Sequence, residues 1–346
     1  MSPVDEDILE LFRVLGAGRL GAKIYCALLS SGQMTLSRLS EETGIVAPQL
    51  YQYLKRLETL GLIEVSRGKP NLYRAVSPDV LEAVYKEKLE RVGKRALEKL
   101  RSMPRRVQAD ERSYGVFVLR SWRSFRARVL EEIKTANYDI LMCGDSAFMK
   151  GYWDELEEKE KKGVNVYVIL YEVPGIPLDE KAVRVTKVRR AVSGDIMAIL
   201  DSKVALVAQR RIGPRDVPEY GLVVEEPVLV DYLEHEFFHR WLRGEVLRDS
   251  PLRLPSVFTV HRLAALEIRE LLSKGRKLRA TVYGRFVGTK NEAVLEGVVT
   301  GVTLDEKRGV THLTLETPTG TVRVGGPDAI LEEFAAYRVE VREVYG

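Results

Sequence analysis

The chain has 346 residues, of which 45% are hydrophobic, so it can form two or three domains with ordinary cores. Its formal net charge of +4 is small for this length and does not by itself indicate a nucleic-acid partner. Cys26 and Cys143 are far apart within apolar runs, which argues against a disulfide framework, and the absence of a signal-like or bilayer-length apolar run leads us to expect a cytoplasmic protein without a membrane partner.

The segment 35–74 has the spacing of a winged helix-turn-helix. Thr35 can cap a short helix, and Gly44 supplies the turn that ends it. A second helix follows, with Pro48 at its first position and Gly61 at its end. Its apolar face consists of Leu50, Leu54 and Leu57. Strands at 63–65 and 72–76 then form a hairpin whose tip would be the wing.

The opposite face of the second helix has the chemistry of a recognition helix. Side-chain amides can pair with adenine edges, and basic groups suit phosphates. Residues 47–74 carry five cations and two carboxylates, a modest local excess of three positive charges. The predicted DNA-binding residues are Thr35, Ser37, Pro48, Gln49, Tyr51, Gln52, Lys55, Arg56, Arg67 and Lys69. The alternative is that the module serves dimerisation or docking to another protein.

Residues 78–110 form the next predicted segment, a helix and linker. Apolar residues recur every three or four positions from Leu81 to Met103, and Pro104 stops the pattern. This spacing is typical of a coiled-coil seam, which would join two subunits and hold two winged modules at a fixed separation. The alternative is that the apolar stripe packs back on its own chain.

Residues 111–249 alternate between apolar strand-like runs and amphipathic helices, which predicts a βαβ-built sheet. We expect strands at 116–119, 138–143, 164–171, 196–200, 204–208 and 220–225, and helices at 122–135, 152–162 and 228–244. The run 199–206 resembles a segment of the phospholipase D-like fold. Gly194 and Ile196 stand where the His and Lys of that fold's H-x-K motif would fall, so the resemblance concerns the scaffold alone.

Residues 250–346 differ in character from the preceding region. After a proline-bearing link at 250–255, a helix is expected at 262–273. Alternating Gly- and Thr-rich segments follow at 277–286, 293–303, 311–316 and 320–324. These segments predict a small β-rich domain.

One pattern suggests an enzyme. Residues 235–239 read H-E-F-F-H, in which two histidines one helical turn apart could bind zinc beside a glutamate. A third ligand would have to be something like His261 or Glu267, across the proline link. If Leu229, Leu233, Phe237 and Trp241 are buried, both histidines lie on the flank of the helix. We therefore expect no metal, cofactor or catalysis, and keep a zinc-dependent hydrolase as an alternative.

Four stretches, in this order, resemble the TrmB family of archaeal sugar-responsive transcription regulators. They are GAKIY at 21–25, RGKPNLYRAV at 67–76, FHRWL at 238–242 and GGPDAILEE at 325–333. The resemblance implies a DNA-binding winged helix, a dimerising coiled coil, and a phospholipase D-like domain that, with a C-terminal β domain, holds maltose, glucose or sucrose.

The same resemblance implies a sugar site near the C-terminus. Its residues would be His235, Gly325, Gly326, Ile330, Leu331 and Glu332. A carboxylate and backbone groups can form paired hydrogen bonds with vicinal hydroxyls. Pro327 departs from the family pattern, and so does 47–52, which lacks an arginine near the start of the recognition helix. The alternative is an ordinary turn at 325–328 before a helix, with Glu332 solvated.

The sequence thus predicts an α+β multidomain protein without catalytic motif. Its domains are a winged helix-turn-helix at 1–77, a coiled-coil helix and linker at 78–110, a phospholipase D-like α/β domain at 111–249 and a small β-rich sugar-binding domain at 250–346. The predicted function is a homodimeric regulator, mainly a repressor, that binds double-stranded promoter DNA with an affinity set by a carbohydrate effector. A DNA-coating protein that ignores ligands is a further alternative.

Overall fold

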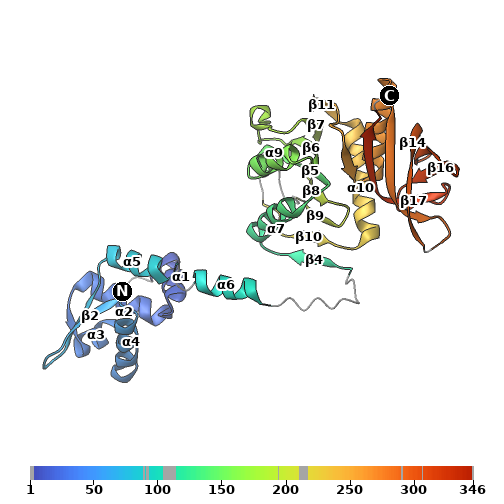
Figure 1. The fold of residues 1–346 in the computed structure, drawn as a ribbon. Helices are drawn as coiled ribbons and strands as arrows, with labels where there is room; N and C mark the ends of the chain where they lie inside the picture. Colours follow the sequence, from blue (N-terminus) through green and yellow to red (C-terminus); the bar gives the residue numbers. More distant parts are fainter. Residues whose placement is uncertain are drawn as a thin grey trace. The chain divides into compact units, whose positions relative to one another are not determined.

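The computed structural model describes residues 4–88, 90, 93–103, 114–193, 195–209, 217–289, 291–305 and 307–344. The chain divides into two compact units, Met1–Asp110 and Glu111–Gly346 (Figure 1). The predicted boundaries at 77/78 and 249/250 lie inside these units. No helix in the described ranges combines the length and apolarity that a membrane crossing needs.

The first unit is a helical domain with a small sheet. Its helices are α1 (Glu6–Leu15), α2 (Gly18–Ser31), α3 (Leu36–Thr43), α4 (Ala47–Thr59), α5 (Pro78–Lys88) and α6 (Lys94–Ser102). Its strands are β1 (Met34–Thr35), β2 (Ile63–Ser66) and β3 (Leu72–Ala75), in the order β1-β3-β2.

Helices α3 and α4 with the β2–β3 hairpin form the predicted winged helix-turn-helix. Thr35 caps α3, because its hydroxyl accepts a hydrogen bond from the backbone N of Arg38 at 3.4 Å. Gly44 ends α3 in the left-handed conformation, with φ 68°. The apolar face of α4 is fully buried against α2 and the hairpin: Leu50, Leu54 and Leu57.

The predicted seam at 78–110 is divided between two environments. Its first apolar side chains, Leu81, Val84 and Tyr85, pack on the core of the winged helix. The apolar side chains of α6 are uncovered, since Leu97 is 52% exposed, Leu100 59% and Met103 61%. Part of the stripe therefore packs back on its own chain, which corrects the expectation of one continuous seam. Pro104 lies outside the described residues.

The second unit begins with an eight-stranded sheet. Its strands are β4 (Val116–Leu119), β5 (Asp139–Asp145), β6 (Asn165–Glu172), β7 (Lys187–Val192), β8 (Asp195–Leu200), β9 (Val204–Gln209), β10 (Gly221–Val224) and β11 (Glu245–Asp249). The order is β11-β7-β6-β5-β8-β9-β10-β4, with β5–β6 and β6–β7 parallel and the other neighbours antiparallel.

Helices cover both faces of this sheet (Figure 1). On one face lie α7 (Trp122–Thr135), α8 (Ser146–Met149) and α9 (Trp153–Lys161), whose apolar side chains share one core with the sheet. A short 3-10 helix, η2 (Glu180–Ala182), precedes β7. On the other face lies α10 (Pro227–Arg243).

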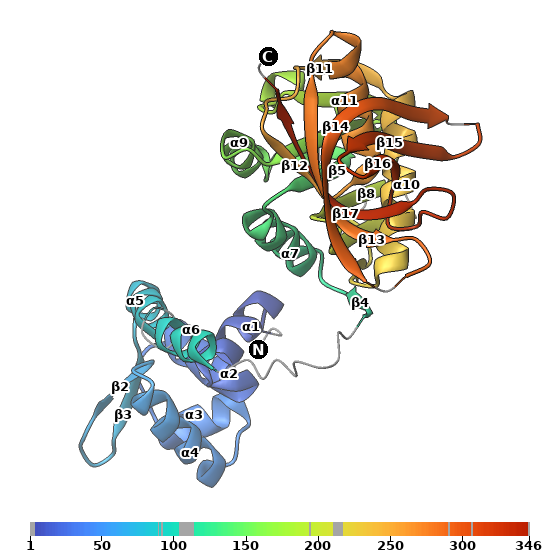
Figure 2. The same ribbon diagram turned by 45° about the vertical axis from the view of Figure 1, so that its right-hand side comes forward.

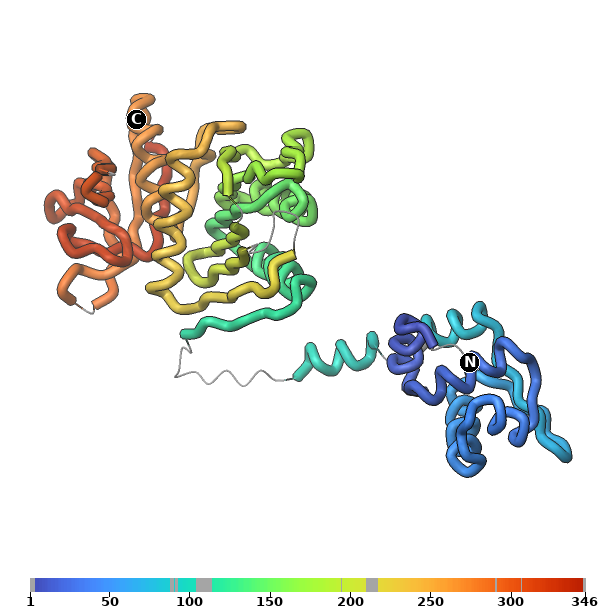
Figure 3. Tube along the Cα trace, turned by 180° about the vertical axis from the view of Figure 1, so that it is seen from behind, coloured from blue at the N-terminus to red at the C-terminus, as the bar shows by residue number. Residues whose placement is uncertain are grey.

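A second sheet and one helix complete the unit. The sheet contains β12 (Ser256–Phe258), β13 (Leu278–Phe286), β14 (Glu292–Asp305), β15 (Val310–Thr317), β16 (Gly320–Gly325) and β17 (Phe334–Glu343), and the helix is α11 (His261–Ser273). Its order is β12-β17-β13-β14-β15-β16, and β16 also pairs with β17 (Figure 2). Helices α10 and α11 lie between the two sheets (Figure 3). One apolar core joins these two helices to both sheets.

The structure differs from the sequence analysis at three places. The alternative of a helix after the turn at 325–328 does not hold, since the chain there passes through bends into β17. Leu229 is 42% exposed, and the buried stripe of α10 instead consists of Val230, Glu234, Phe237, Phe238 and Trp241. Strands β7, β11, β12 and β17 were not predicted. Charged residues weaken the local strand pattern of β7 and β11, and β12 has only three residues. In all four, neighbouring strands supply the pairing.

Candidate DNA-binding face and effector pocket

The polar face of α4 is open to solvent. All the predicted DNA-binding side chains are exposed except that of Thr35, which is half-buried because it caps α3. Gln49 and Gln52 lie three residues apart and therefore share one side of the helix. That side lies opposite the buried leucines, so these amides are free to reach a ligand.

Two cations of the wing are already paired within the protein. Arg67 lies 2.8 Å from Glu58, and Arg74 is bonded to Glu64. Within the described part of the chain no carboxylate pairs with Lys55, Arg56 or Lys69. These three side chains carry the local positive excess, which suits contact with a phosphate backbone.

A polar pocket of about 230 Å³ lies in the second unit, beside the start of α11. Its lining comes from α11, the β14–β15 turn and the segment after β16: His261, Arg262, Arg308, Gly309, Val310, Thr311, Gly326, Asp328, Ala329, Ile330, Leu331 and Glu332. Ligand pockets for drug-sized molecules span about 300–1,000 Å³, so this pocket suits a small ligand.

Four of the six predicted sugar-site residues line this pocket: Gly326, Ile330, Leu331 and Glu332. Gly325 adjoins it, and its lack of a side chain allows Glu332 to approach. A Cβ there would lie 2.9 Å from Glu332 Oε2 and 2.7 Å from the Cβ of Ala329. The side chain of Glu332 is only 8% exposed, so the alternative of a solvated Glu332 does not hold.

His235 is not among the lining residues. It lies on α10, where burial lowers the pKa of its imidazole and the charge of Arg262 lowers it further. The structure thus does not bring His235 to the pocket wall with the four predicted residues that line it.

His261 is a pocket residue that the sequence suggested only as a zinc ligand. It is 3% exposed, and burial lowers its pKa to about 4, so the ring is neutral at pH 7. Its Nε2 lies 3.0 Å from the carbonyl oxygen of Val324 and must donate, because a carbonyl only accepts. Nδ1 is then an acceptor, beside Gly326. A sugar hydroxyl is a suitable donor to it.

Arg262 is a second pocket residue that no motif indicated. Its side chain is 9% exposed and bonds in two directions. Nη1 donates to Asp231 of α10 at 3.1 Å, and Nη2 donates to Asp328 of the pocket at 3.1 Å. One guanidinium therefore joins the pocket to the helix between the two sheets.

The features that suggested catalysis have other partners. His235 and His239 lie edge to face with ring centroids 5.9 Å apart, and Glu236 pairs with Arg240 at 2.7 Å. His261 is bonded to Val324, and Glu267 accepts from Tyr167 and pairs with Lys187. Where the chain is described, no three His, Cys, Asp or Glu side chains are arranged to hold a metal.

Gly194 and Ile196 are the positions at which the phospholipase D-like fold would place the His and Lys of its H-x-K motif. Ile196 is fully buried in the core beneath α7, and Gly194 lies outside the described residues. Asp201 accepts hydrogen bonds from three backbone N–H groups, those of Asn137, Tyr138 and Asp139, at 2.8–3.0 Å. Its carboxylate therefore fixes the start of β5.

A winged helix-turn-helix joined to a domain with a small polar pocket defines the class of effector-responsive transcription regulators. Three family models match successive parts of the chain: the sugar-specific transcriptional regulator TrmB at 12–79, the N-terminal subdomain of the TrmB effector-binding domain at 115–248, and the C-terminal subdomain of TrmB and TrmBL1 at 253–344. The chain belongs to the TrmB family of transcriptional regulators.

Two individual proteins are similar to this chain in sequence. The sugar-sensing transcriptional regulator TrmBL1 of Pyrococcus furiosus is 22% identical over 345 residues, covering 95% of this chain and 97% of that protein. TrmBL2 of the same organism is 29% identical over 160 residues, 43% of this chain and 61% of that protein.

Solved structures show more distant likeness. TrmBL2, described as an archaeal chromatin protein, has a TM-score of 0.40 at 22% identity, with 70% of this chain and 99% of that chain covered. The phospholipase D family member Nuc of Salmonella typhimurium has a TM-score of 0.30 at 17% identity, with 39% and 99% covered.

Proposed function

We propose that this protein is a dimeric DNA-binding regulator whose affinity for promoter DNA is set by a carbohydrate in the pocket beside α11. The observation that carries the proposal is that one chain joins an open, polar recognition helix to a pocket lined by a buried carboxylate, a neutral histidine and exposed apolar side chains. The TrmB family and its sugar-sensing relative support the same assignment.

The DNA contact follows from the chemistry of α4 and the wing. Gln49 and Gln52 present amides that can pair with adenine, and Lys55, Arg56 and Lys69 supply phosphate contacts. Three such cations give a modest salt dependence. A dimer adds the second half-site, and the uncovered apolar face of α6 is the surface that we assign to it.

The pocket suits a carbohydrate because it offers donors, acceptors and apolar surface together. Glu332 and the Nδ1 of His261 can accept hydrogen bonds from hydroxyls, and Arg262 and Arg308 can donate. Ile330 and Leu331 are 82% and 59% exposed, and they supply an apolar wall for the C–H face of a sugar ring. The eight-stranded part acts in this proposal as a phospholipase D-like scaffold without catalytic groups.

In this proposal, sugar binding and DNA binding are thermodynamically linked. A sugar changes DNA affinity only by the difference between its affinities for the DNA-competent and DNA-incompetent dimers. A coupling of about 1–3 kcal/mol gives a change of roughly five- to 150-fold.

The test has two stages. Thermal unfolding of the full chain is measured with maltose, glucose and sucrose, and footprinting on promoter DNA follows with and without any sugar that stabilises the protein. We expect at least one sugar to raise the unfolding temperature and to change protection of a defined site. Protection of all sequences alike, unchanged by every sugar, would instead identify a DNA-coating protein.

A further inference from the structure

A second cavity, of about 400 Å³, lies in the effector unit away from the sugar pocket. Its lining comes from β7, α10, the end of β11 and α11, and includes Arg189, Trp241, Asp249, Leu266, Glu267 and Arg269. It shares no lining residue with the pocket beside Glu332. Because its walls belong to both family-defined subdomains, a ligand here would contact both.

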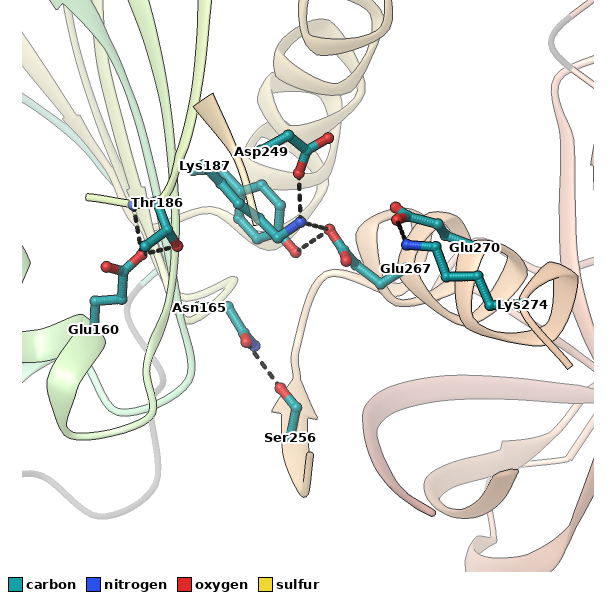
Figure 4. A network of polar contacts seen from close by, with 10 residues as sticks. Glu160, Asn165, Thr186, Lys187, Asp249, Ser256, Glu267, Glu270 and Lys274 are labelled. Carbon is teal, nitrogen blue, oxygen red and sulfur yellow. Dashed lines mark hydrogen bonds and ion pairs between the residues drawn. The ribbon is translucent and has the colours of Figure 1, made fainter. Parts of the chain in front are cut away.

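The carboxylates of this cavity already have cations of their own (Figure 4). Lys187 Nζ lies 2.9 Å from Asp249 and 2.9 Å from Glu267. Glu270, a further lining residue, is paired with Lys274. Each acidic group therefore has an ion-pair partner inside the protein, although the single charge of Lys187 is shared by Asp249 and Glu267.

The two arginines are not compensated in the same way. Among the residues that the structure describes, neither Arg189 nor Arg269 forms an ion pair, although the nearby charges of Asp249 and Glu267 favour the charged form of Arg189. Arg189 donates one hydrogen bond, from Nη1 to the carbonyl oxygen of Trp241, while its Nε is buried without a partner. Its guanidinium lies over the Trp241 ring, 4.7 Å from the centroid, which fixes the plane of the group.

This arrangement has a definite ligand preference. An arginine carries five N–H donors in a planar fork that matches the oxygens of a phosphate or carboxylate, and a guanidinium held by stacking loses little entropy on binding. Leu266, half-buried on the cavity wall, adds apolar surface. We infer that this cavity is a second effector site for a small organic oxyanion, with Arg189 and Arg269 contacting its charged group and Leu266 beside its apolar body.

The test uses the full-length protein and simple probes in isothermal titration calorimetry. Phenyl phosphate and benzoate carry an oxyanion on a ring, inorganic phosphate carries the charge alone, and benzyl alcohol carries the ring alone. We expect an oxyanion-bearing ring to bind about tenfold or more tightly than benzyl alcohol, since charge-assisted hydrogen bonds are the strong contacts of the site. The ratio of phenyl phosphate to benzoate affinity then distinguishes phosphate from carboxylate ligands.

Variants locate the binding. Arg269→Gln, at an exposed position, and Arg189→Lys, which keeps the charge but removes the fork, should each weaken the tighter ring oxyanion by roughly tenfold. Arg285→Gln makes the same charge change on β13 outside the cavity and should bind as the parent does. Equal affinity for benzyl alcohol and both ring oxyanions would overturn the inference, as would unchanged binding in both cavity variants. These probes contain no sugar or DNA, so the result is independent of the proposed function.

Discussion

Glu332 shows how the absence of one side chain positions another. Gly325 has no Cβ, and a Cβ there would meet Glu332 Oε2 at 2.9 Å. The carboxylate therefore lies inside the pocket, 3.6 Å from His312 Nδ1, instead of in solvent. A carboxylate buried beside a cavity is available for hydrogen bonds from a ligand that brings its own donors.

Replacing this carboxylate should remove the sugar response and little else. We expect Glu332→Ala to weaken the binding of an active sugar by roughly ten- to 100-fold, because hydrogen bonds to a charged group contribute about 1.5–3 kcal/mol. Sugar-free DNA binding should be unchanged. Calorimetry measures the first quantity and fluorescence anisotropy the second. Glu333→Ala is the matched control, since Glu333 pairs with Arg323 outside the pocket lining; equal sugar affinity in both variants would reject the assignment.

Glu234 makes a separate prediction about pH. Burial raises its pKa from 4.5 to about 8, and its Oε1 has no hydrogen-bond partner. Because the folded-state pKa is higher, the folded protein holds this proton from about pH 4.5 to pH 8 while the unfolded chain releases it. The stability that the group contributes is thus full below pH 4.5 and is lost as pH rises towards 8.

Glu234→Gln removes this titration. We expect the free energy of unfolding of the variant to exceed that of the parent by a margin that grows from pH 5 to about pH 8, by up to about 1.4 kcal/mol per pH unit, and then levels off. Urea unfolding followed by tryptophan fluorescence is suitable, because all three tryptophans belong to the second unit. Parallel stability curves for the two proteins would contradict the assignment.

At the scale of elements, we propose that α4 contacts base edges of DNA and that the wing contacts the phosphate backbone. Gln52 is exposed on the polar face of α4, and Lys69 is exposed at the tip of the hairpin. An amide on the helix reads bases, whereas a cation on the wing reads charge. Substitutions at the two positions should therefore differ in kind.

We predict that Gln52→Ala lowers the preference for a footprinted site over random DNA by about 1–3 kcal/mol. Lys69→Ala should weaken both duplexes alike and reduce the salt slope by about one. Anisotropy titrations on both duplexes at several salt concentrations measure these effects. An equal loss on specific and random DNA for Gln52→Ala would show that this side chain does not read bases.

The two helices α10 and α11 connect the pocket to the eight-stranded sheet. Arg262 holds Asp328 of the pocket with one nitrogen and Asp231 of α10 with the other. Asp231 does not line the pocket. Any rearrangement of Asp328 on sugar binding therefore alters the attachment of α10 through one buried guanidinium.

Asp231→Asn tests this connection. We expect the sugar to bind within a few-fold of its normal affinity, while the change in DNA affinity that the sugar causes shrinks, because the coupling of about 1–3 kcal/mol depends on a differential contact. Glu236→Gln, on the same helix and paired only with Arg240 in the described structure, is the control. A full sugar response in Asp231→Asn would place the coupling elsewhere.

At the scale of the whole molecule, the regulatory proposal requires two copies of the chain. Leu97 and Leu100 of α6 are uncovered, whereas Leu81, Val84 and Tyr85 of α5 are packed on the winged helix. An amphipathic helix with a solvent-exposed apolar stripe is stabilised when a second copy covers it.

Leu100→Asp should therefore favour the monomer and lower the affinity for a two-half-site promoter. Light scattering with size-exclusion chromatography measures the mass, and anisotropy measures the DNA affinity. Lys99→Asp introduces a carboxylate at the neighbouring polar position and should leave the dimer intact. A dimer that withstands Leu100→Asp would require a different interface.

Much of the fold could be predicted because it depends on local patterns. The bounds of α3, α7 and β4 agree with the prediction to the residue, since a capping threonine, helical periodicity and short apolar runs act over a few neighbouring positions. Strand β17 was not predicted, although its residues 338–342 alternate polar and apolar side chains as a half-buried strand does. Which strands it pairs with, β12, β13 and β16, depends on the tertiary structure.

The sequence by itself determined the DNA-binding module and its polar face, and the glycine-rich turn with Glu332, because each is written in residues close together along the chain. Only the tertiary structure decided which groups meet at the pocket. His261 and Val324 are 63 residues apart, and Arg262 lies 31 residues from Asp231 and 66 from Asp328. Such contacts depend on two sheets packing against the same pair of helices, and no spacing within one segment encodes that packing.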